Sequence, residues 1–165
     1  ELERVVTGRI PTASGYRTLR ALPRQELRAT LSDAVAACRA TGAETVVLDA
    51  GAVGIDWAPR VGADAAVLGL PDGPTEQWEP LAALHEAGVR LCFDTVPVAG
   101  RTPVSELVRR VLGPWRELGM DPAALLGTVL APSARISELT PPELPDALQR
   151  VTHLGGALTE ACNEG

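Results

Sequence analysis

The feature that most constrains the fold is a set of four short apolar runs, at residues 45–48, 65–68, 89–93 and 128–130. Each run is apolar nearly throughout, whereas a strand with one face in water alternates apolar and polar residues. Continuous apolar strands are typical of parallel sheets in which both faces are covered. The four runs therefore predict four strands of a parallel sheet.

Helical patterns lie before, between and after these runs. Residues 24–41 repeat apolar side chains at helical spacing and end at Gly42, and residues 73–87 end in the same way at Gly88. Residues 102–118 begin with Pro103 at the first helical position, and residues 142–161 carry a stripe of leucine and valine. The predicted order is helix, strand, short connection, strand, helix, strand, helix, strand, helix, which is a series of βα units.

Two α/β architectures with a parallel sheet fit this order in a single domain, residues 1–165. One is half of a (β/α)8 TIM barrel, and the other is a small open doubly wound sheet. Four strands are too few to close a barrel, whose usual length is about 250 residues. The barrel interpretation therefore requires either a missing half of the barrel or a second copy of the chain in a homodimer.

The composition argues against several classes of protein. The net charge is −6 and the fifteen basic side chains are all scattered arginines, so we expect no nucleic-acid partner. No apolar run approaches the roughly 20 residues of a membrane span and no secretory signal precedes residue 20, so we expect a cytoplasmic protein without a membrane partner. The three separate cysteines do not predict a disulfide framework. Because the chain begins at Glu1, we expect a fragment or a processed product.

Candidate ligand-binding residues lie where the predicted strands end. Asp49 and Asp94 each follow an apolar run directly. Because the carboxyl ends of parallel strands open to one edge of the sheet, both carboxylates are predicted to face the same site, as a general base or as ligands for a cationic group. Alternatively, each aspartate accepts hydrogen bonds from the turn that follows it. Ser133 and Arg135 are the corresponding candidates after the fourth run.

Tyr16 and Arg17 are further candidates because they combine an aromatic ring and a guanidinium group in a segment rich in small residues. Such a loop can clamp a carboxylate or a phosphate, although a solvated turn is an equally good interpretation. Neither histidine lies at a predicted strand end, and no Ser–His–Asp set or H-x-C motif is present. No catalytic residue is assigned on these grounds.

Five segments occur in order along nearly the whole chain: GRIPTASGYRTLRAL, ETVVLDAG, RVGADAAVLGL, AGVRLCFDTVPVAGRTP and LLGTVLAPSARIS. Together they resemble the C-terminal catalytic barrel of cobalamin-independent methionine synthases, and above all the short single-barrel members of that family. The resemblance implies the C-terminal half of a TIM barrel, with the N-terminal half missing. It also implies a methyltransferase in which zinc activates the thiol of homocysteine for methyl transfer from methyltetrahydrofolate.

The resemblance implies zinc ligands that this chain does not retain. In the family they are a His-x-Cys pair, a glutamate and a cysteine, each at a strand end. The corresponding positions are Leu48 and Ala50 for the pair (Val47 and Asp49 if the register moves by one), Gly69 for the glutamate and Ala134 for the cysteine. Because the ligand types of the family are absent from these positions, we expect no metal and no cofactor.

Three functional hypotheses follow. The first is a methionine-synthase-like barrel that is degenerate at its zinc site, a pseudoenzyme that binds a small-molecule ligand or a partner protein. The second is an active methyltransferase that moves a methyl group from methyltetrahydrofolate to a homocysteine-like thiol. The third is a small open α/β domain unrelated to this family. Fold alone does not decide among them.

Overall fold

The computed structural model describes residues 9–12, 15–18, 23–49, 55–96, 102–133 and 139–164. Two strands, β1 (Arg9–Thr12) and β2 (Gly15–Thr18), pair as an antiparallel hairpin. The other four form one parallel sheet: β3 (Val47–Asp49), β4 (Ala65–Leu68), β5 (Arg90–Val96) and β6 (Val129–Pro132). The predicted parallel sheet is therefore confirmed, with strand boundaries shifted by up to three residues.

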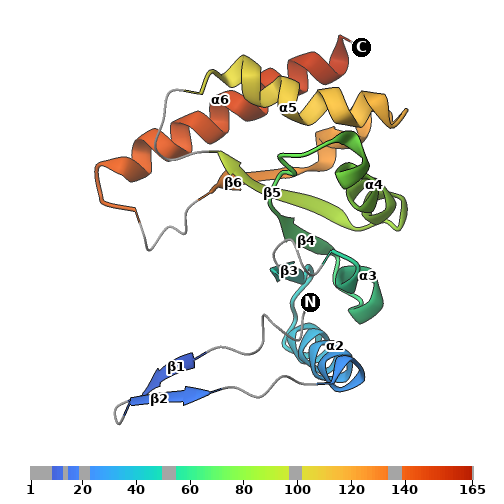
Figure 1. Ribbon diagram of the computed structural model, residues 1–165, viewed down its shortest axis with the longest axis vertical. Helices are drawn as coiled ribbons and strands as arrows, with labels where there is room; N and C mark the ends of the chain where they lie inside the picture. The colour runs from blue at the N-terminus through green and yellow to red at the C-terminus, as the bar shows by residue number, and fades with distance from the viewer. Residues whose placement is uncertain are drawn as a thin grey trace.

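The helices lie beside this sheet (Figure 1). They are α2 (Arg24–Ala40), α3 (Trp57–Val61), α4 (Glu79–Glu86), α5 (Val104–Glu117) and α6 (Glu143–Asn163), with the 3₁₀ turns η2 (Thr75–Trp78) and η3 (Pro122–Gly127). Helices α5 and α6 lie side by side next to β6, and α2 and α3 lie at the opposite end of the sheet, next to β3. None of the helices in the described ranges has the length and apolar character needed to cross a bilayer.

Three details of the sequence prediction were wrong. The short connection between the first two strands contains the helix α3, which Asp56 precedes and Gly62 ends. The single helix predicted over 73–87 is divided into η2 and α4, because Pro80 lies at the start of α4, where a proline is tolerated. Residues 15–18, predicted as a loop or turn, form strand β2.

The turn from α4 to β5 shows why these helices end where they do. Gly88 has φ +78°, a left-handed conformation that glycine adopts without a Cβ clash. Its N–H donates to the carbonyl of His85 at 2.9 Å, and the N–H of Val89 donates to the carbonyl of Leu84 at 3.0 Å. These bonds satisfy the last carbonyl groups of α4 and direct the chain into β5.

The strands of the parallel sheet are arranged in chain order, β3-β4-β5-β6. A crossover between parallel strands is almost always right-handed, so successive crossovers in one direction place their helices on one face of the sheet. A doubly wound sheet covers its second face by reversing the strand order. The strand order of the described sheet contains no such reversal.

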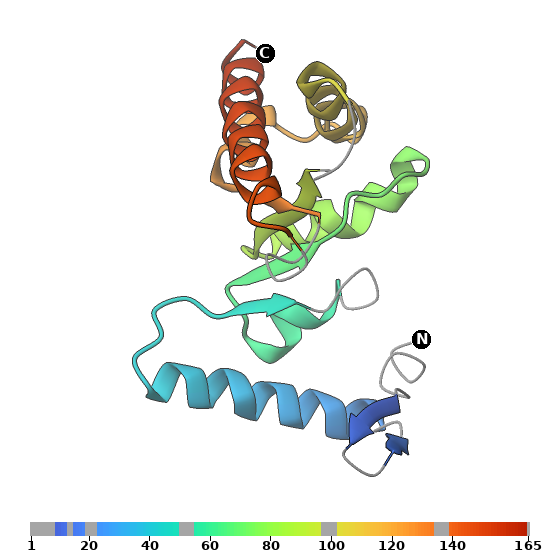
Figure 2. The same cartoon turned by 90° about the vertical axis from the view of Figure 1, so that its left-hand side faces the viewer.

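The pairing register divides the sheet residues into two faces. The helix face consists of Leu48, Ala66, Leu68, Leu91, Phe93 and Leu130, which pack in the main core with side chains from α2, α3, α4, α5 and α6. Three tryptophans, Trp57, Trp78 and Trp115, are buried in this core. Figure 2 shows α2 running below α3 and β3, with the hairpin β1–β2 beside its N-terminal end.

The other face, here called the open face, consists of Val47, Asp49, Ala65, Val67, Arg90, Cys92, Asp94, Val129 and Ala131. Val47 and Val129, on the two edge strands, are 49% and 47% exposed. Ala65 and Cys92 are buried, yet neither belongs to the core that the helices form. Within the described ranges, the helices thus pack against one face of the sheet, and on the other face the edge residues Val47 and Val129 remain exposed to solvent.

Candidate functional site

The carboxyl ends of the strands bring Asp49 and Asp94 to the same side of the sheet, as predicted. Asp49 is the last residue of β3 and is exposed, while Asp94 lies within β5 and is half-buried. In the register of the sheet, Asp49 is level with Cys92, two residues before Asp94, so both aspartates belong to the open face. The sequence predicted that this strand ends at Phe93. Instead, β5 continues to Val96, past an irregularity in its pairing with β6 between Asp94 and Val96.

These two residues, here called the aspartate pair, interact electrostatically. Burial is the main cause that raises the pKa of Asp94, and the negative charge of Asp49 raises it further. A hydrogen bond from the backbone of Asp94 to its own side chain opposes these effects. Asp94 therefore keeps its proton to a higher pH than an ordinary aspartate, and a positively charged group beside the pair would relieve the repulsion.

The residue beside Asp94 on the neighbouring strand end is Gly69. A Cβ atom added at Gly69 would lie 3.7 Å from Oδ1 of Asp94, an ordinary van der Waals distance. The missing side chain thus leaves space next to the half-buried carboxylate. A long side chain at position 69 would occupy this space.

Ser133 lies at the same edge, directly after β6. Its backbone N–H donates to the carbonyl of Val96 at 2.9 Å, which extends the pairing of β5 and β6, and its side chain is exposed. The other predicted candidate at this strand end, Arg135, lies outside the described residues. The structure therefore brings Ser133, Asp94 and Asp49 to one edge.

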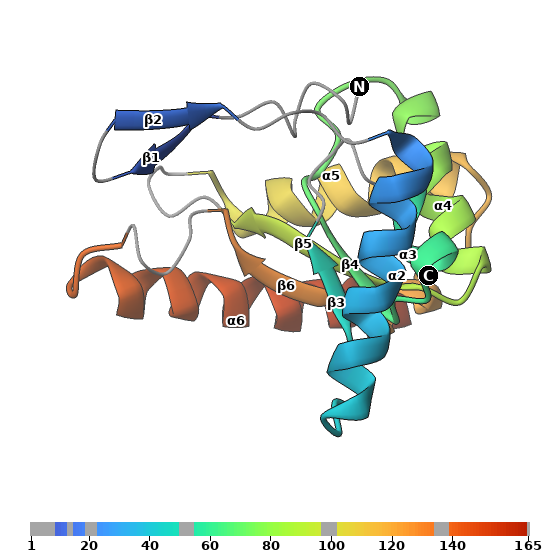
Figure 3. The same cartoon turned by 90° about the horizontal axis from the view of Figure 1, so that it is seen from below.

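Tyr16 and Arg17 belong to β2, opposite Pro11 and Ile10 of β1, so the prediction of a loop or turn at these residues was wrong. Strand β1 was not predicted from the sequence, because it contains a proline and is only four residues long. The hairpin is a separate two-stranded sheet. Figure 3 shows it on the side of the molecule toward which β5 and β6 point. Only the backbone of these residues is described.

The described residues contain no group of three or more His, Cys, Asp or Glu side chains placed to hold a metal ion. Of the positions that correspond to zinc ligands in the resembled family, Leu48 and Gly69 carry no side-chain donor atom, while Ala50 and Ala134 lie outside the described residues. In the alternative register, Val47 carries none either, and Asp49 has a carboxylate in place of the cysteine. The cysteines are free: Cys38 is exposed, and Cys92 and Cys162 are buried. Burial raises the pKa of the Cys92 thiol, which makes a reactive thiolate at the sheet less favourable.

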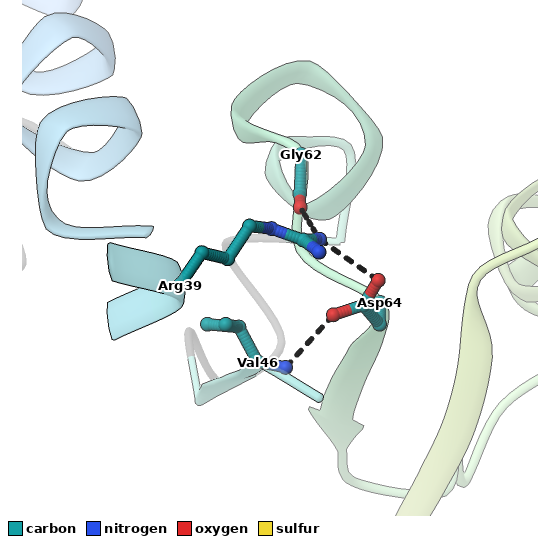
Figure 4. Close-up of polar contacts among 4 residues, drawn as sticks. All are labelled: Arg39, Val46, Gly62 and Asp64. Carbon is teal, nitrogen blue, oxygen red and sulfur yellow. Dashed lines mark hydrogen bonds and ion pairs between the residues drawn. The ribbon is translucent and has the colours of Figure 1, made fainter. Parts of the chain in front are cut away.

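The amino ends of the strands carry a polar cluster that was not predicted from the sequence (Figure 4). Asp64 accepts hydrogen bonds from the guanidinium of Arg39 at 2.9 Å and from the N–H of Val46 at 2.8 Å. Arg39 also donates to the carbonyl of Gly62 at 2.9 Å. These contacts join the end of α2 to the segments that begin β3 and β4. The Gly-Ala-Asp sequence directly before β4 was the available signal in the sequence.

The hydrogen bond from Val46 is the largest cause that holds the pKa of Asp64 below its ordinary value, followed by the hydrogen bond from Arg39. Because this cluster lies at the opposite ends of the strands from the aspartate pair, its role is to hold the scaffold. The candidate site remains the carboxyl edge of the open face.

Comparison of the chain with protein-family models, with curated proteins and with solved structures finds no match.

Proposed function

We propose that this chain is the C-terminal half of a methionine-synthase-like (β/α)8 barrel and that it acts as a binding domain without zinc chemistry. The family assignment rests on the five sequence segments that resemble the family. The observation that carries the proposal is the open face, where Val47 and Val129 remain about half exposed on a sheet whose other face packs against the helices.

The open face combines charged and apolar residues. On β5 it presents Arg90, Cys92 and Asp94, whereas the other three strands present mainly small and branched apolar residues: Val47, Ala65, Val67, Val129 and Ala131. In a TIM barrel, side chains of this type fill the interior, and the active site lies at the carboxyl ends of the strands. Exposed strand edges and apolar patches favour association, so the open face and the free edges of β3 and β6 favour a partner that supplies strands.

The number of helices indicates that the partner of the open face is a different half-barrel and not a second copy of this chain. Helix α2 precedes β3 and α6 follows β6, so the described residues supply five helices for four strands. A TIM barrel contains eight strands and eight helices. Two copies together would bring ten helices. Where β6 of one copy met β3 of the other, α6 of the first copy and α2 of the second would both fall at the single helix position between these two strands. The partner that fits is a segment of four parallel strands and three helices.

In the completed barrel, the aspartate pair would lie at the mouth together with Ser133. Two carboxylates, one of which already resists ionisation, favour a small ligand that carries an amine or another cationic group. The alternative function, an active methyltransferase, has weaker support because Leu48 and Gly69 carry no zinc-binding atom.

The proposal is tested by the rate of thiol labelling at position 47. Val47→Cys and Leu148→Cys are introduced separately, each with Cys38→Ser, because Cys38 is the exposed cysteine. Val47 and Leu148 are both 49% exposed, but Leu148 lies on α6. We expect the cysteine at 47 to react rapidly in the purified chain and slowly when the chain is at its native level in an extract of its own cells.

The cysteine at 148 is the matched control and is expected to react at the same rate in both settings. Rapid labelling at 47 in the extract would contradict the proposal, because the open face would then have no partner. Slow labelling at 47 in the purified chain, together with a dimeric mass, would show that a second copy covers the face and would overturn the argument from the helices.

A further inference from the structure

A separate pocket of about 370 Å³ lies between α5 and the segment that joins β4 to η2. None of the candidate residues at the carboxyl edge lines it. Small-molecule sites commonly have volumes of roughly 300–1,000 Å³, so this pocket can hold a compact ligand. Its lining combines a buried tryptophan with charged side chains of both signs, and each of these groups constrains the ligand.

The tryptophan is Trp78, the last residue of η2. It is 1% exposed, and its ring lies 6.3 Å from the ring of Phe93, centroid to centroid, which fixes the indole against the core. Its Nε1 is buried and has no hydrogen-bond partner among the described residues. A buried indole N–H normally donates to an acceptor, so Trp78 favours a ligand that brings an acceptor atom into the pocket.

The charged lining residues are Asp72, Glu106, Glu117, Arg109 and Arg110. Arg110 forms an ion pair with Asp72 and Arg109 with Glu106, while Glu117 accepts a hydrogen bond from the hydroxyl of Thr75. The three carboxylates oppose the binding of a simple anion. A simple cation would meet two guanidinium groups and would leave the indole N–H without an acceptor.

Pro114 adds a backbone acceptor to the lining. It lies inside α5 and has no N–H to donate to the carbonyl of Arg110, one helical turn earlier. Both residues line the pocket. A ligand that carries N–H donors can therefore bond to this carbonyl and to the carboxylate of Glu117.

We propose that this pocket binds a small zwitterion with an ammonium and a carboxylate group, of the size of a free α-amino acid. The carboxylate accepts from the indole N–H of Trp78 and from Arg109, whose side chain is 75% exposed and can turn toward a ligand. The ammonium group donates to Glu117 and to the carbonyl of Arg110. Such a ligand complements both the positive and the negative side chains of the pocket, and it provides the hydrogen-bond acceptor that the indole N–H of Trp78 lacks.

The test uses three probes that share one isobutyl group: L-leucine, which is a zwitterion, L-leucinamide, which is a cation, and 4-methylpentanoate, which is an anion. Each is titrated into the ¹⁵N-labelled chain, and the three indole N–H signals are followed by NMR. Trp78→Phe assigns the signal of Trp78. Trp115 is the internal control, because its Nε1 already donates to the carbonyl of Asp121 at 3.0 Å.

We expect leucine to shift the Trp78 signal in a saturable way, and the other two probes to leave it in place at the same concentrations. Arg109→Gln should weaken leucine binding about tenfold, the effect of losing one charge-assisted hydrogen bond. Arg28→Gln, at an exposed position on α2, should not change it. No shift with leucine, or equal shifts with all three probes, would overturn the proposal.

Discussion

At the scale of single residues, Asp64 shows how one carboxylate can organise several elements. It receives donors from α2 and from the segment before β3 while its own backbone leads into β4. Its backbone carbonyl also accepts from the N–H of Arg90 at 2.9 Å, at the start of β5. One residue thus fixes the amino ends of three neighbouring strands.

Asp64→Asn is expected to lower Tm at neutral pH, because an amide is a weaker acceptor for Arg39 and for the N–H of Val46. The pKa of Asp64 is lowered from 3.8, so its stabilising contribution is present above pH 3.8 and is lost as the pH falls through the lower, folded-state value. The difference in Tm between wild type and variant should therefore shrink as the pH falls below 3.8.

Thermal unfolding followed by circular dichroism across this pH range measures the difference. Asp33→Asn, at an exposed position on α2, is the control and should leave Tm nearly unchanged at every pH. A Tm difference for Asp64→Asn that stayed constant down to the lowest pH would show that the carboxylate charge is not what stabilises the cluster.

The candidate site could be predicted from the sequence in part. Asp49 and Asp94 follow apolar runs, and parallel strands open to one edge, so their placement on one side of the sheet could be predicted. The raised pKa of Asp94 could not, because it depends on burial by side chains distant in sequence. The unpartnered indole N–H of Trp78 could not be predicted either. The sequence shows an apolar residue at helical spacing, but it does not show the pocket beside that residue.

At the scale of secondary structure, long periodic segments were predicted well and short ones poorly. Helix α2 was predicted over 24–41 and observed over Arg24–Ala40, because seventeen residues repeat the apolar spacing several times. Helix α3, with five residues, repeats it barely once and was missed. The hairpin strands have four residues each and include Pro11, which lowers strand propensity.

Truncation of a side chain should change the free energy of unfolding strongly on the helix face of the sheet and only slightly on the open face. Leu68, on the helix face, is 1% exposed, whereas Val47, on the open face, is 49% exposed. Leu68→Ala should lower the free energy of unfolding by about 2–5 kcal/mol, since it removes buried methyl groups and leaves a cavity. Val47→Ala should change it by less than about 0.5 kcal/mol.

Urea unfolding of the isolated chain measures both values. A loss for Val47→Ala as large as that for Leu68→Ala would mean that the open face is already covered in the isolated chain. Such a result would contradict the description of this face as uncovered.

At the scale of the whole molecule, the apolar runs predict a sheet covered on both faces, while helices in the described ranges cover one. This difference supports the proposal that a partner covers the open face. A prediction from this sequence can identify the strands as parallel, but it cannot say whether the second layer belongs to the same chain. The strand order supports the proposed barrel half. It could not be predicted, because it depends on which strands pair and not on the propensities of single residues.

The proposed function also predicts the behaviour of the intact protein toward zinc. The untagged chain, dialysed against zinc and then against buffer, should retain no stoichiometric zinc by elemental analysis. It should transfer no methyl group from methyltetrahydrofolate to homocysteine, because Leu48 and Gly69 provide no metal-binding atom. Retention of one zinc per chain together with methyl transfer would favour the alternative, an active methyltransferase.

The chain order of the strands also has a consequence for biosynthesis. Strands β4, β5 and β6 each pair with the strand translated just before them, so the contacts of the sheet form between segments close in sequence. Successive βα units can therefore dock one after another as they leave the ribosome. The edge of β6 becomes available last, and as long as this edge is unpaired and uncovered it exposes the nascent protein to aggregation.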